Sequence, residues 1–386
     1  AAGPGHTEGD GHDHGKHAAK GESSHGGHDQ SEAEGEEDHV RMTAEQIENQ
    51  DIKVAKAEGG LLSRHILVPG TITPDTDRIA RVPVRVVGTV SEMRKRLGDD
   101  VRKGDVVAVL DRHHPPETAQ SWDRVGLVTG DPTHPVRRIH AAVDPTLAVV
   151  DEARRLRADL LVTHHPLLLR GVHSVATTNA KGRTVTDLIS SGVALYVAHT
   201  NADVADPGVN TALADALGLQ HVEPLVVEEG QPLGRVGELP AGETLAAFAE
   251  RLDTVLPSAP GGIRVAGDPG AVVRRVAVLG GAGDSAFDAV RASGADVYVT
   301  ADLRHHPVLE AREEAAGGPP YLVDAGHWAT ESLWLRTALD RLVAALVADG
   351  HDAATVETHV SEVRTDPWTF TVGATGPGVP TTGEHR

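Results

Sequence analysis

Short apolar runs alternate with segments of helical spacing, and this alternation restricts the fold more than any other feature of the chain. Residues 139–143, 160–162 and 194–198 are strand-like runs. Between them, residues 147–157 and 185–190 carry apolar side chains at helical spacing. Strands that alternate with helices form mainly parallel sheets with helices on their faces. The sequence therefore predicts an α/β fold.

The same alternation returns later in the chain. Strands are expected at residues 273–279, 297–300 and 321–323, and helices near 285–293 and 307–315 and from about 329 to 348. We therefore predict two α/β lobes, residues 112–224 and 225–372, and a disordered tail at residues 373–386.

Residues 1–41 are acidic, poor in apolar side chains and rich in histidine. The histidines are His6, His12, His14, His17, His25, His28 and His39. So little apolar surface cannot offset the chain entropy lost on folding, and this predicts disorder. The clustered imidazoles suit weak binding of Zn, Ni, Cu or Co. A solvated acidic tail explains the segment equally well.

Residues 42–111 have a different texture. Thr43-Ala44-Glu45-Gln46 is a capping-box pattern that opens a short helix. Further on, Gly98-Asp99 and Gly104-Asp105 separate short apolar pairs, which is typical of small β-hairpins. The run 105–111 suits two alternatives, the end of a β-strand or the start of the first helix of the following module.

The composition excludes several kinds of site. With no cysteine, disulfides, thiolate nucleophiles and Cys-ligated zinc are ruled out, while 23 histidines supply nitrogen ligands. A net charge of −20 argues against nucleic acid as a partner. No run approaches the roughly 18 apolar residues of a membrane-spanning helix. No export signal is visible, so we expect a cytoplasmic location.

Polar residues follow directly on the expected strands. His164 and His165, His199 and His327 each come just after an apolar strand. In open α/β sheets the ligand crevice lies beyond the carboxyl ends of the strands. We therefore expect these side chains to meet at one place.

Each local pattern also has a simpler explanation. His164 and His165, fixed by Pro166, can address two different metal ions or form a surface pair. Asp203 can be a ligand or can cap the helix that follows. His327 and Glu331, spaced i, i+4, share one helix face as ligands or as an ordinary polar pair. Their occurrence together favours a metal site.

Three imidazoles and two carboxylates suit a pair of divalent ions, with one carboxylate bridging them. Zn, Mn, Fe, Co or Ni would fit these ligands. Two such ions activate water for hydrolysis. Glu331 or Asp203 would bridge the ions or polarise the attacking water, and these two are the predicted catalytic residues.

Several motifs in this region resemble one known family. They are Trp122-Asp123-Arg124-Val125-Gly126-Leu127, Val143-Asp144-Pro145-Thr146, Thr163-His164-His165-Pro166, His199-Thr200-Asn201-Ala202-Asp203, Tyr298-Val299-Thr300-Ala301-Asp302, Gly326-His327-Trp328-Ala329-Thr330-Glu331 and residues 361–370. With them, residues 112–386 resemble the Nif-three-like dinuclear metal centre proteins, also described as type 2 GTP cyclohydrolase I. The resemblance implies two α/β lobes without an inserted domain, a homo-hexameric ring and opening of the GTP ring. It places the metal ligands at His164, His165, Asp203, His327 and Glu331.

The N-terminal part is similar to a different family. The His-rich head, Met42-Thr43-Ala44-Glu45-Gln46-Ile47, Leu67-Val68-Pro69-Gly70 and Val87-Gly88-Thr89-Val90 carry the likeness. Through them, residues 1–111 resemble the start of a periplasmic adaptor of heavy-metal efflux pumps. This implies half of a lipoyl-like β-sandwich at residues 42–111, efflux-pump partners and a periplasmic location. The long helical hairpin and the second lipoyl half of that family are absent.

Three hypotheses for function follow. The first is a metal-dependent hydrolase of a small, nucleotide-like substrate. The second is a non-catalytic metal-binding or metallochaperone scaffold, and the third is a fragment of an efflux adaptor that binds metal through its His-rich head.

Weaker features are also noted. Gly280-Gly281-Ala282-Gly283-Asp284 could cradle a phosphate, although a tight strand-to-helix turn is favoured. The remaining candidates are Asp302 as a cavity residue, His305 and His306 as surface residues, His113 and His114 in a loop, and His173 and His199 as residues that orient ligands.

Overall fold

The structure is a computed structural model that describes residues 101–352 and 355–372. The chain divides into two compact units, Ala1–Val68 and Pro69–Arg386, and every described residue belongs to the second. The predicted His-rich tail, the adaptor-like segment up to residue 100 and the C-terminal tail lie outside the described residues. Within the described residues, no helix is both long and apolar enough to cross a membrane.

The first sheet confirms the α/β prediction and has five strands. Their order is β1 (Gly126–Thr129), β4 (Ala194–Val197), β3 (Leu160–Thr163), β2 (Arg138–Ala142) and β11 (Glu357–Val360). The last four are parallel and β1 is an antiparallel edge strand.

Alternation along these strands separates two apolar faces. Ile139, Leu160 and Tyr196 point to one face, where α2 (Lys103–His113) and α11 (Trp334–Ala348) pack. Leu161 and Leu195 point to the other, against α3 (Leu147–Arg155) and α4 (Ala180–Ser190). Because successive side chains of a strand point to opposite faces, runs of consecutive apolar residues are needed to cover both.

The second sheet has six strands and is mixed. Its order is β5 (Gln220–Glu228), β6 (Gln231–Thr244), β8 (Val272–Ala282), β9 (Val297–Ala301), β10 (Tyr321–Asp324) and β7 (Arg264–Ala266). Only β8, β9 and β10 are mutually parallel. The antiparallel β5–β6 hairpin, which turns at Glu229 and Gly230, was not predicted.

Helices cover both faces of the second sheet. One core cluster includes residues of α6 (Val209–Ala216) and α7 (Leu245–Val255), and the other includes residues of α8 (Phe287–Ser293) and α9 (His305–Glu314). Short elements complete the fold: the 3₁₀ helices Pro116–Thr118 (η1) and Asp284–Ala286 (η2), and the helices α5 (Thr200–Val204) and α10 (His327–Ser332).

The hairpin predicted around Gly104-Asp105 is wrong, because α2 occupies these residues. Val106, Val109 and Leu110 are buried in the core of the first lobe, so the predicted boundary at residue 112 falls inside a helix of that lobe. The helical alternative for residues 105–111 is the correct one. His113, predicted to lie in a loop, is the last residue of α2, whereas His114 follows the helix as its C-cap and is only 1% exposed.

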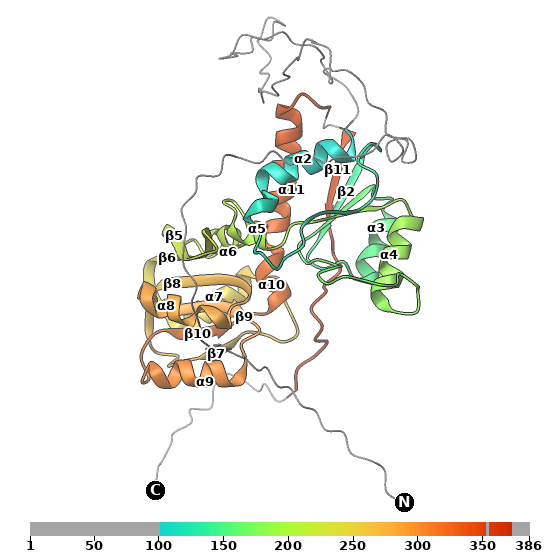
Figure 1. Cartoon of the computed structure of the whole chain (residues 1–386). Coiled ribbons are helices and arrows are strands. Elements are labelled where there is room, and N and C mark those ends of the chain that lie inside the picture. Colours follow the sequence, from blue (N-terminus) through green and yellow to red (C-terminus); the bar gives the residue numbers. More distant parts are fainter. Residues whose placement is uncertain (1–100, 353–354, 373–386) are drawn as a thin grey trace, which may run out of the picture. The chain divides into compact units, whose positions relative to one another are not determined.

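The long helix predicted from about residue 329 to 348 is two helices that meet at Leu333. The first, α10, contacts the second sheet, whereas α11 lies beside α2 on the first sheet (Figure 1). With β11, α11 returns the chain to the first lobe, although residues 225–372 were predicted as the second. Trp334, Leu339 and Leu342 explain the return, because they form the apolar face that the first sheet buries.

Strand register brings the predicted site residues together. In the first sheet Thr163 pairs with both Ala142 and Val197, so three parallel strands end at the same level. In the second sheet Thr300 pairs with Asp324 in the same way. The loops that follow these ends carry the polar side chains of the candidate site.

Candidate metal centre

Glu331, on α10, lies at the centre of three imidazoles. Its Oε1 is 3.1 Å from Nε2 of His327 and 3.4 Å from Nε2 of His164. Its Oε2 is 3.1 Å from Nε2 of His165. The structure therefore brings four of the five predicted ligands together, and each of the three imidazoles directs its Nε2 atom toward Glu331. The i, i+4 spacing of His327 and Glu331 places both on one face of α10, as expected.

The fifth predicted ligand, Asp203, lies at the edge of this cluster. It belongs to the short helix α5, which follows β4. Its Oδ1 is 3.7 Å from Nε2 of His164. Asp203 is therefore near enough to share a cation with His164.

The opposite ring nitrogen of each imidazole is held by an acceptor. Nδ1 of His164 donates to the carbonyl oxygen of Ala198 at 2.9 Å. Nδ1 of His165 donates to Asp144 at 2.7 Å, and Nδ1 of His327 donates to Asp302 at 2.8 Å. These bonds place a proton on Nδ1, so that in the neutral form of each ring the Nε2 lone pair faces Glu331, which is the arrangement typical of metal-ligating histidines.

Three buried atoms at the centre lack a hydrogen-bond partner among the described residues. They are Nε2 of His164, Oδ1 of Asp203 and Oε2 of Glu331. A buried polar atom without a partner costs roughly 1–3 kcal/mol. A divalent cation among these atoms would satisfy all three, so the residues fit a metal.

Burial and neighbouring charges shift the pKa values of the two carboxylates in opposite directions. Burial alone would raise the pKa of Glu331, but the facing imidazoles of His164 and His165 hold it well below its usual range. Burial, and then the charge of Glu331, raise the pKa of Asp203 well above its usual range.

The imidazoles respond in two ways. Burial lowers the pKa of His164. Burial also opposes protonation of His165 and His327, but neighbouring carboxylates outweigh it and raise both pKa values to about 10. Without metal the cluster therefore binds protons, and metal binding must displace them.

His199 was predicted to orient a ligand, but it lies close enough to the centre to be a ligand itself. One nitrogen each of His164, His165 and His199 lies within 4.8 Å of the others, a spacing that could hold a metal ion. The Nδ1 of His199 donates to Asp123 at 3.0 Å, and Asp123 also accepts from the backbone and hydroxyl of Thr200. The position of His199 directly after a strand was the signal for this role.

Asp144 was not proposed as a site residue, although it stands directly after the strand β2. Asp302 was expected only to line a cavity. Both carboxylates hold ligand-type histidines, and strand pairing across the sheets is what places them there.

The glycine-rich run that begins at the end of β8 does not cradle a ligand with its first two amides. The amide of Gly280 donates to Asn210 and that of Gly281 donates to Thr330. Gly281 has φ +71°, and a Cβ there would lie 2.3 Å from Oε1 of Glu331. A residue without a side chain is therefore needed for β8 to pass this close to the centre.

Two other expectations can be compared with the structure. His305 and His306 are exposed, as predicted. His173 is exposed on the loop between β3 and α4, which differs from its predicted orienting role.

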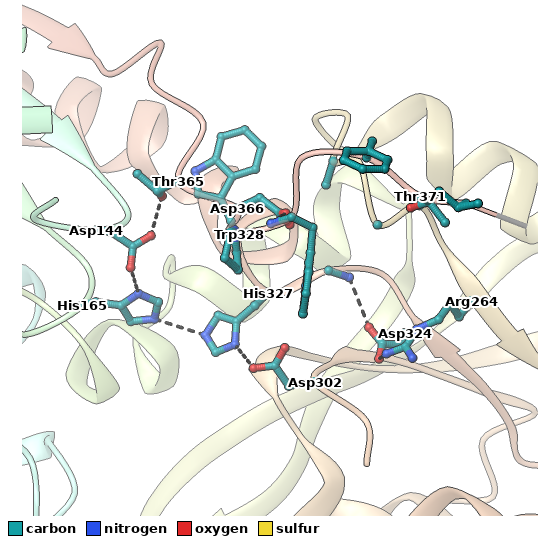
Figure 2. A pocket seen from close by; sticks show the side chains of 18 residues that line it. Asp144, His165, Arg264, Asp302, Asp324, His327, Trp328, Thr365, Asp366 and Thr371 are labelled. Atoms are coloured by element: carbon teal, nitrogen blue, oxygen red, sulfur yellow. Dashed lines mark hydrogen bonds and ion pairs between the residues drawn. The ribbon is translucent and has the colours of Figure 1, made fainter. Parts of the chain in front are cut away.

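A pocket of about 600 Å³ opens beside the centre. His165 and His327 form part of its wall, and Figure 2 shows them between Asp144 and Asp302. The rest of the lining includes Trp328, Trp368, Phe370, Arg264 and Asp324. The cluster is therefore accessible to a small molecule from one side.

Comparison with known proteins agrees with this geometry. The sequence profile of the family described as Duf34/NIF3 (NGG1p interacting factor 3) matches residues 101–367. A Streptomyces coelicolor protein called GTP cyclohydrolase 1 type 2 homolog is 52% identical over 278 residues, 71% of this chain and 95% of the relative. A Mycobacterium tuberculosis protein of the same name is 35% identical, covering 69% of this chain and 97% of the relative.

Solved structures show the same fold. A Bacillus cereus protein related to NIF3 superposes with a TM-score of 0.65 at 26% identity, covering 71% of this chain and 100% of that one. A Staphylococcus aureus hypothetical protein superposes with a TM-score of 0.64 at 28% identity and the same coverage.

Proposed function

Because the chain belongs to the Duf34/NIF3 family, we propose that it is a metal-dependent hydrolase of a small, nucleotide-like molecule. In this proposal two divalent cations, of Zn, Mn, Fe, Co or Ni, are held by His164, His165, Asp203, His327 and Glu331. The observation that carries the proposal is the convergence of three Nε2 atoms on Glu331, each with its Nδ1 already bonded.

The two oxygens of Glu331 face different imidazoles. Oε1 lies near His164 and His327, and Oε2 lies near His165. A carboxylate placed in this way suits a position shared by two cations. Glu331 would therefore be the carboxylate able to contact both cations, and Asp203 would be a second carboxylate on the side of His164.

Bound divalent cations supply Lewis acidity and lower the pKa of bound water to about 7. The residues of the chain supply the rest. Glu331 and Asp203 orient the attacking water, and His165 and His327 present the reacting side to the pocket. Trp328 and Phe370 give this pocket part of an apolar wall.

The lining of the pocket favours an organic substrate with a planar ring. It also contains the carboxylates of Asp144, Asp302, Asp324 and Asp366, so an anionic group would have to lie next to the cations and Arg264. Trp328, Trp368 and Phe370 offer aromatic surface against which a planar ring can pack. Arg264 pairs with Asp324, yet its side chain is 69% exposed, so further N–H groups remain for an anionic group. The name shared by the curated relatives, GTP cyclohydrolase 1 type 2 homolog, agrees with such a substrate.

Metal content of the full chain tests the metal centre. Elemental mass spectrometry after dialysis would compare the wild type with His164→Ala and Glu331→Gln. The His-rich segment is the same in all three proteins, so the difference between them reports the centre alone. We expect the wild type to hold about two more ions per chain than either variant. Equal metal content in all three would refute the ligand assignment.

Turnover tests the hydrolase part of the proposal. The metal-loaded wild type would be incubated with GTP and then with other nucleotides, with Glu331→Gln as the control. Release of a hydrolysis product by the wild type alone is the expected result. Metal binding without turnover of any nucleotide would favour the metallochaperone scaffold instead.

The homo-hexamer implied by the family resemblance is also proposed for this chain. Light scattering coupled to size-exclusion chromatography measures it directly. The cytoplasmic location, and the efflux-adaptor role of the N-terminal segment, stay predictions.

A further inference from the structure

Residues 361–372, called the strap below, connect the two lobes without forming a helix or strand. The strap begins after β11 on the first sheet, and its far end reaches the loop before β7 in the second lobe (Figure 1). Much of it, from Thr365 to Val372, lines the pocket beside the centre. The strap is therefore a third wall of the pocket, in addition to the two lobes.

Side-chain hydrogen bonds hold the strap at three points. Near its start, the hydroxyl of Ser361 donates to Glu152. In the middle, the hydroxyl of Thr365 donates to Asp144. Near its end, the hydroxyl of Thr371 donates to the carbonyl oxygen of Pro260.

The middle contact differs from the others because Asp144 also holds a histidine of the centre. Oδ2 of Asp144 accepts from Thr365, and Oδ1 accepts from Nδ1 of His165 at 2.7 Å. Figure 2 shows Thr365, Asp144, His165 and His327 as one continuous run of contacts. A carboxylate bonded at both oxygens cannot rotate without losing one bond, so Thr365 fixes the plane in which Asp144 receives His165.

We propose that Thr365 is a positioning residue of the metal centre, which acts through Asp144 to orient His165. The proposal rests on the proposed function, because it takes His165 as a ligand. Partners of metal-ligating histidines typically change metal affinity by 10–100-fold when they are lost. Thr365 is not such a partner itself but hydrogen-bonds to one, Asp144. Through this contact the strap influences the metal affinity of the centre.

Thr365→Val tests the proposal because valine keeps the shape of threonine and removes the hydroxyl. The matched control is Thr371→Val, which removes the hydrogen bond from the Thr371 hydroxyl to Pro260. Pro260 does not hold any histidine of the centre. Thr365→Ser keeps the hydroxyl and should restore the wild-type behaviour. All three variants and the wild type would be made as full chains.

The measurement is the affinity for Zn²⁺, obtained by competition with a chromophoric chelator, together with the absorption spectrum of the Co²⁺ form. We expect roughly tenfold weaker binding and a changed spectrum for Thr365→Val. Thr371→Val should stay within about twofold of the wild type, and so should Thr365→Ser.

The outcomes separate the two proposals. If the wild type binds Zn²⁺ no more tightly than Glu331→Gln does, the metal centre itself is refuted. Wild-type affinity in Thr365→Val, or an equal loss in Thr371→Val, would overturn only the role of Thr365. If Thr365→Val fails to fold, Thr365→Ser still decides, because weakened binding in that folded variant would contradict a role for the hydroxyl.

Discussion

The centre has a buried half and an open half, and the protein holds them differently. The side chains of His164 and Glu331 are 0% and 4% exposed, whereas those of His165 and His327 are 22% and 32% exposed. In the buried half, the acceptor for His164 is a neutral backbone carbonyl. In the open half, the acceptors are the carboxylates Asp144 and Asp302.

This difference shows where in the centre a carboxylate can serve as the partner of an imidazole. A further buried carboxylate next to Glu331 and Asp203 would be costly, since burial already disfavours ionisation there. Near the pocket, water reduces that cost, and a carboxylate makes the imidazole a better ligand. The buried half is therefore held by neutral partners, and the open half places carboxylates next to the imidazoles that line the pocket.

The largest expected effect is the loss of stability when the buried half is truncated. In metal-free protein, His164→Ala removes a fully buried ring and should cost about 2–4 kcal/mol. His165→Ala, on the open side, should cost at most about 1 kcal/mol near pH 10, where most of the stabilisation from its charge is lost and water can fill the space. Urea unfolding in the presence of EDTA measures both. Equal losses would mean that the two halves do not differ in packing.

The second effect concerns the carboxylates of the open half. Asp144→Asn should weaken Zn²⁺ binding roughly 10–100-fold, because a neutral amide raises the basicity of the His165 ring less than a carboxylate does. Asp302→Asn should weaken it less, since the side chain of Asp302 is 60% exposed and water screens its charge. Chelator competition gives both affinities. A larger effect at Asp302 would contradict the importance of burial in this comparison.

The smallest expected effect is a pH dependence of metal-free stability. The pKa of His165 is raised in the folded state from 6.5 to about 10, because Glu331 and Asp144 outweigh burial. Its contribution is therefore complete below pH 6.5 and is lost as the pH rises toward 10. His164, whose pKa burial lowers, acts in the opposite direction and favours unfolding as the pH falls below 6.5.

Urea unfolding from pH 6.5 to 10 in EDTA and constant salt tests this sign. His327, whose pKa is also raised to about 10, adds to the slope, which should therefore stay under about 2.8 kcal/mol per pH unit, the limit for two protons. His165→Asn should reduce the slope, and the remainder should come from His327. A rise in stability over the same range would contradict the assigned direction.

Local sequence patterns were sufficient to predict which side chains the structure brings together, but not which residues hold them in place. His164 and His165 at a strand end, and His327 and Glu331 at helical spacing, are features of a few neighbouring residues. The role of Asp144 depends instead on how β2 pairs with β3, which no local pattern specifies.

The errors in the fold have the same origin. The turn residues Gly104-Asp105 favoured a hairpin, but Val106 and Leu110 are buried beneath α11, more than two hundred residues later. Contact with that distant helix decides between the two alternatives for this run. The break at Leu333 was missed for a related reason, because the two helices beside it serve different sheets.

The return of the chain to the first sheet has a consequence for biosynthesis. A ribosome synthesises the second lobe before it reaches β11, so a nascent chain that already contains every proposed ligand still lacks an edge strand of its first sheet. Contacts so distant along the chain form late and slow folding. In the proposed metal centre, uptake of metal is then expected only after β11 has been synthesised, and a stop codon shortly before residue 357 should prevent it without removing any proposed ligand.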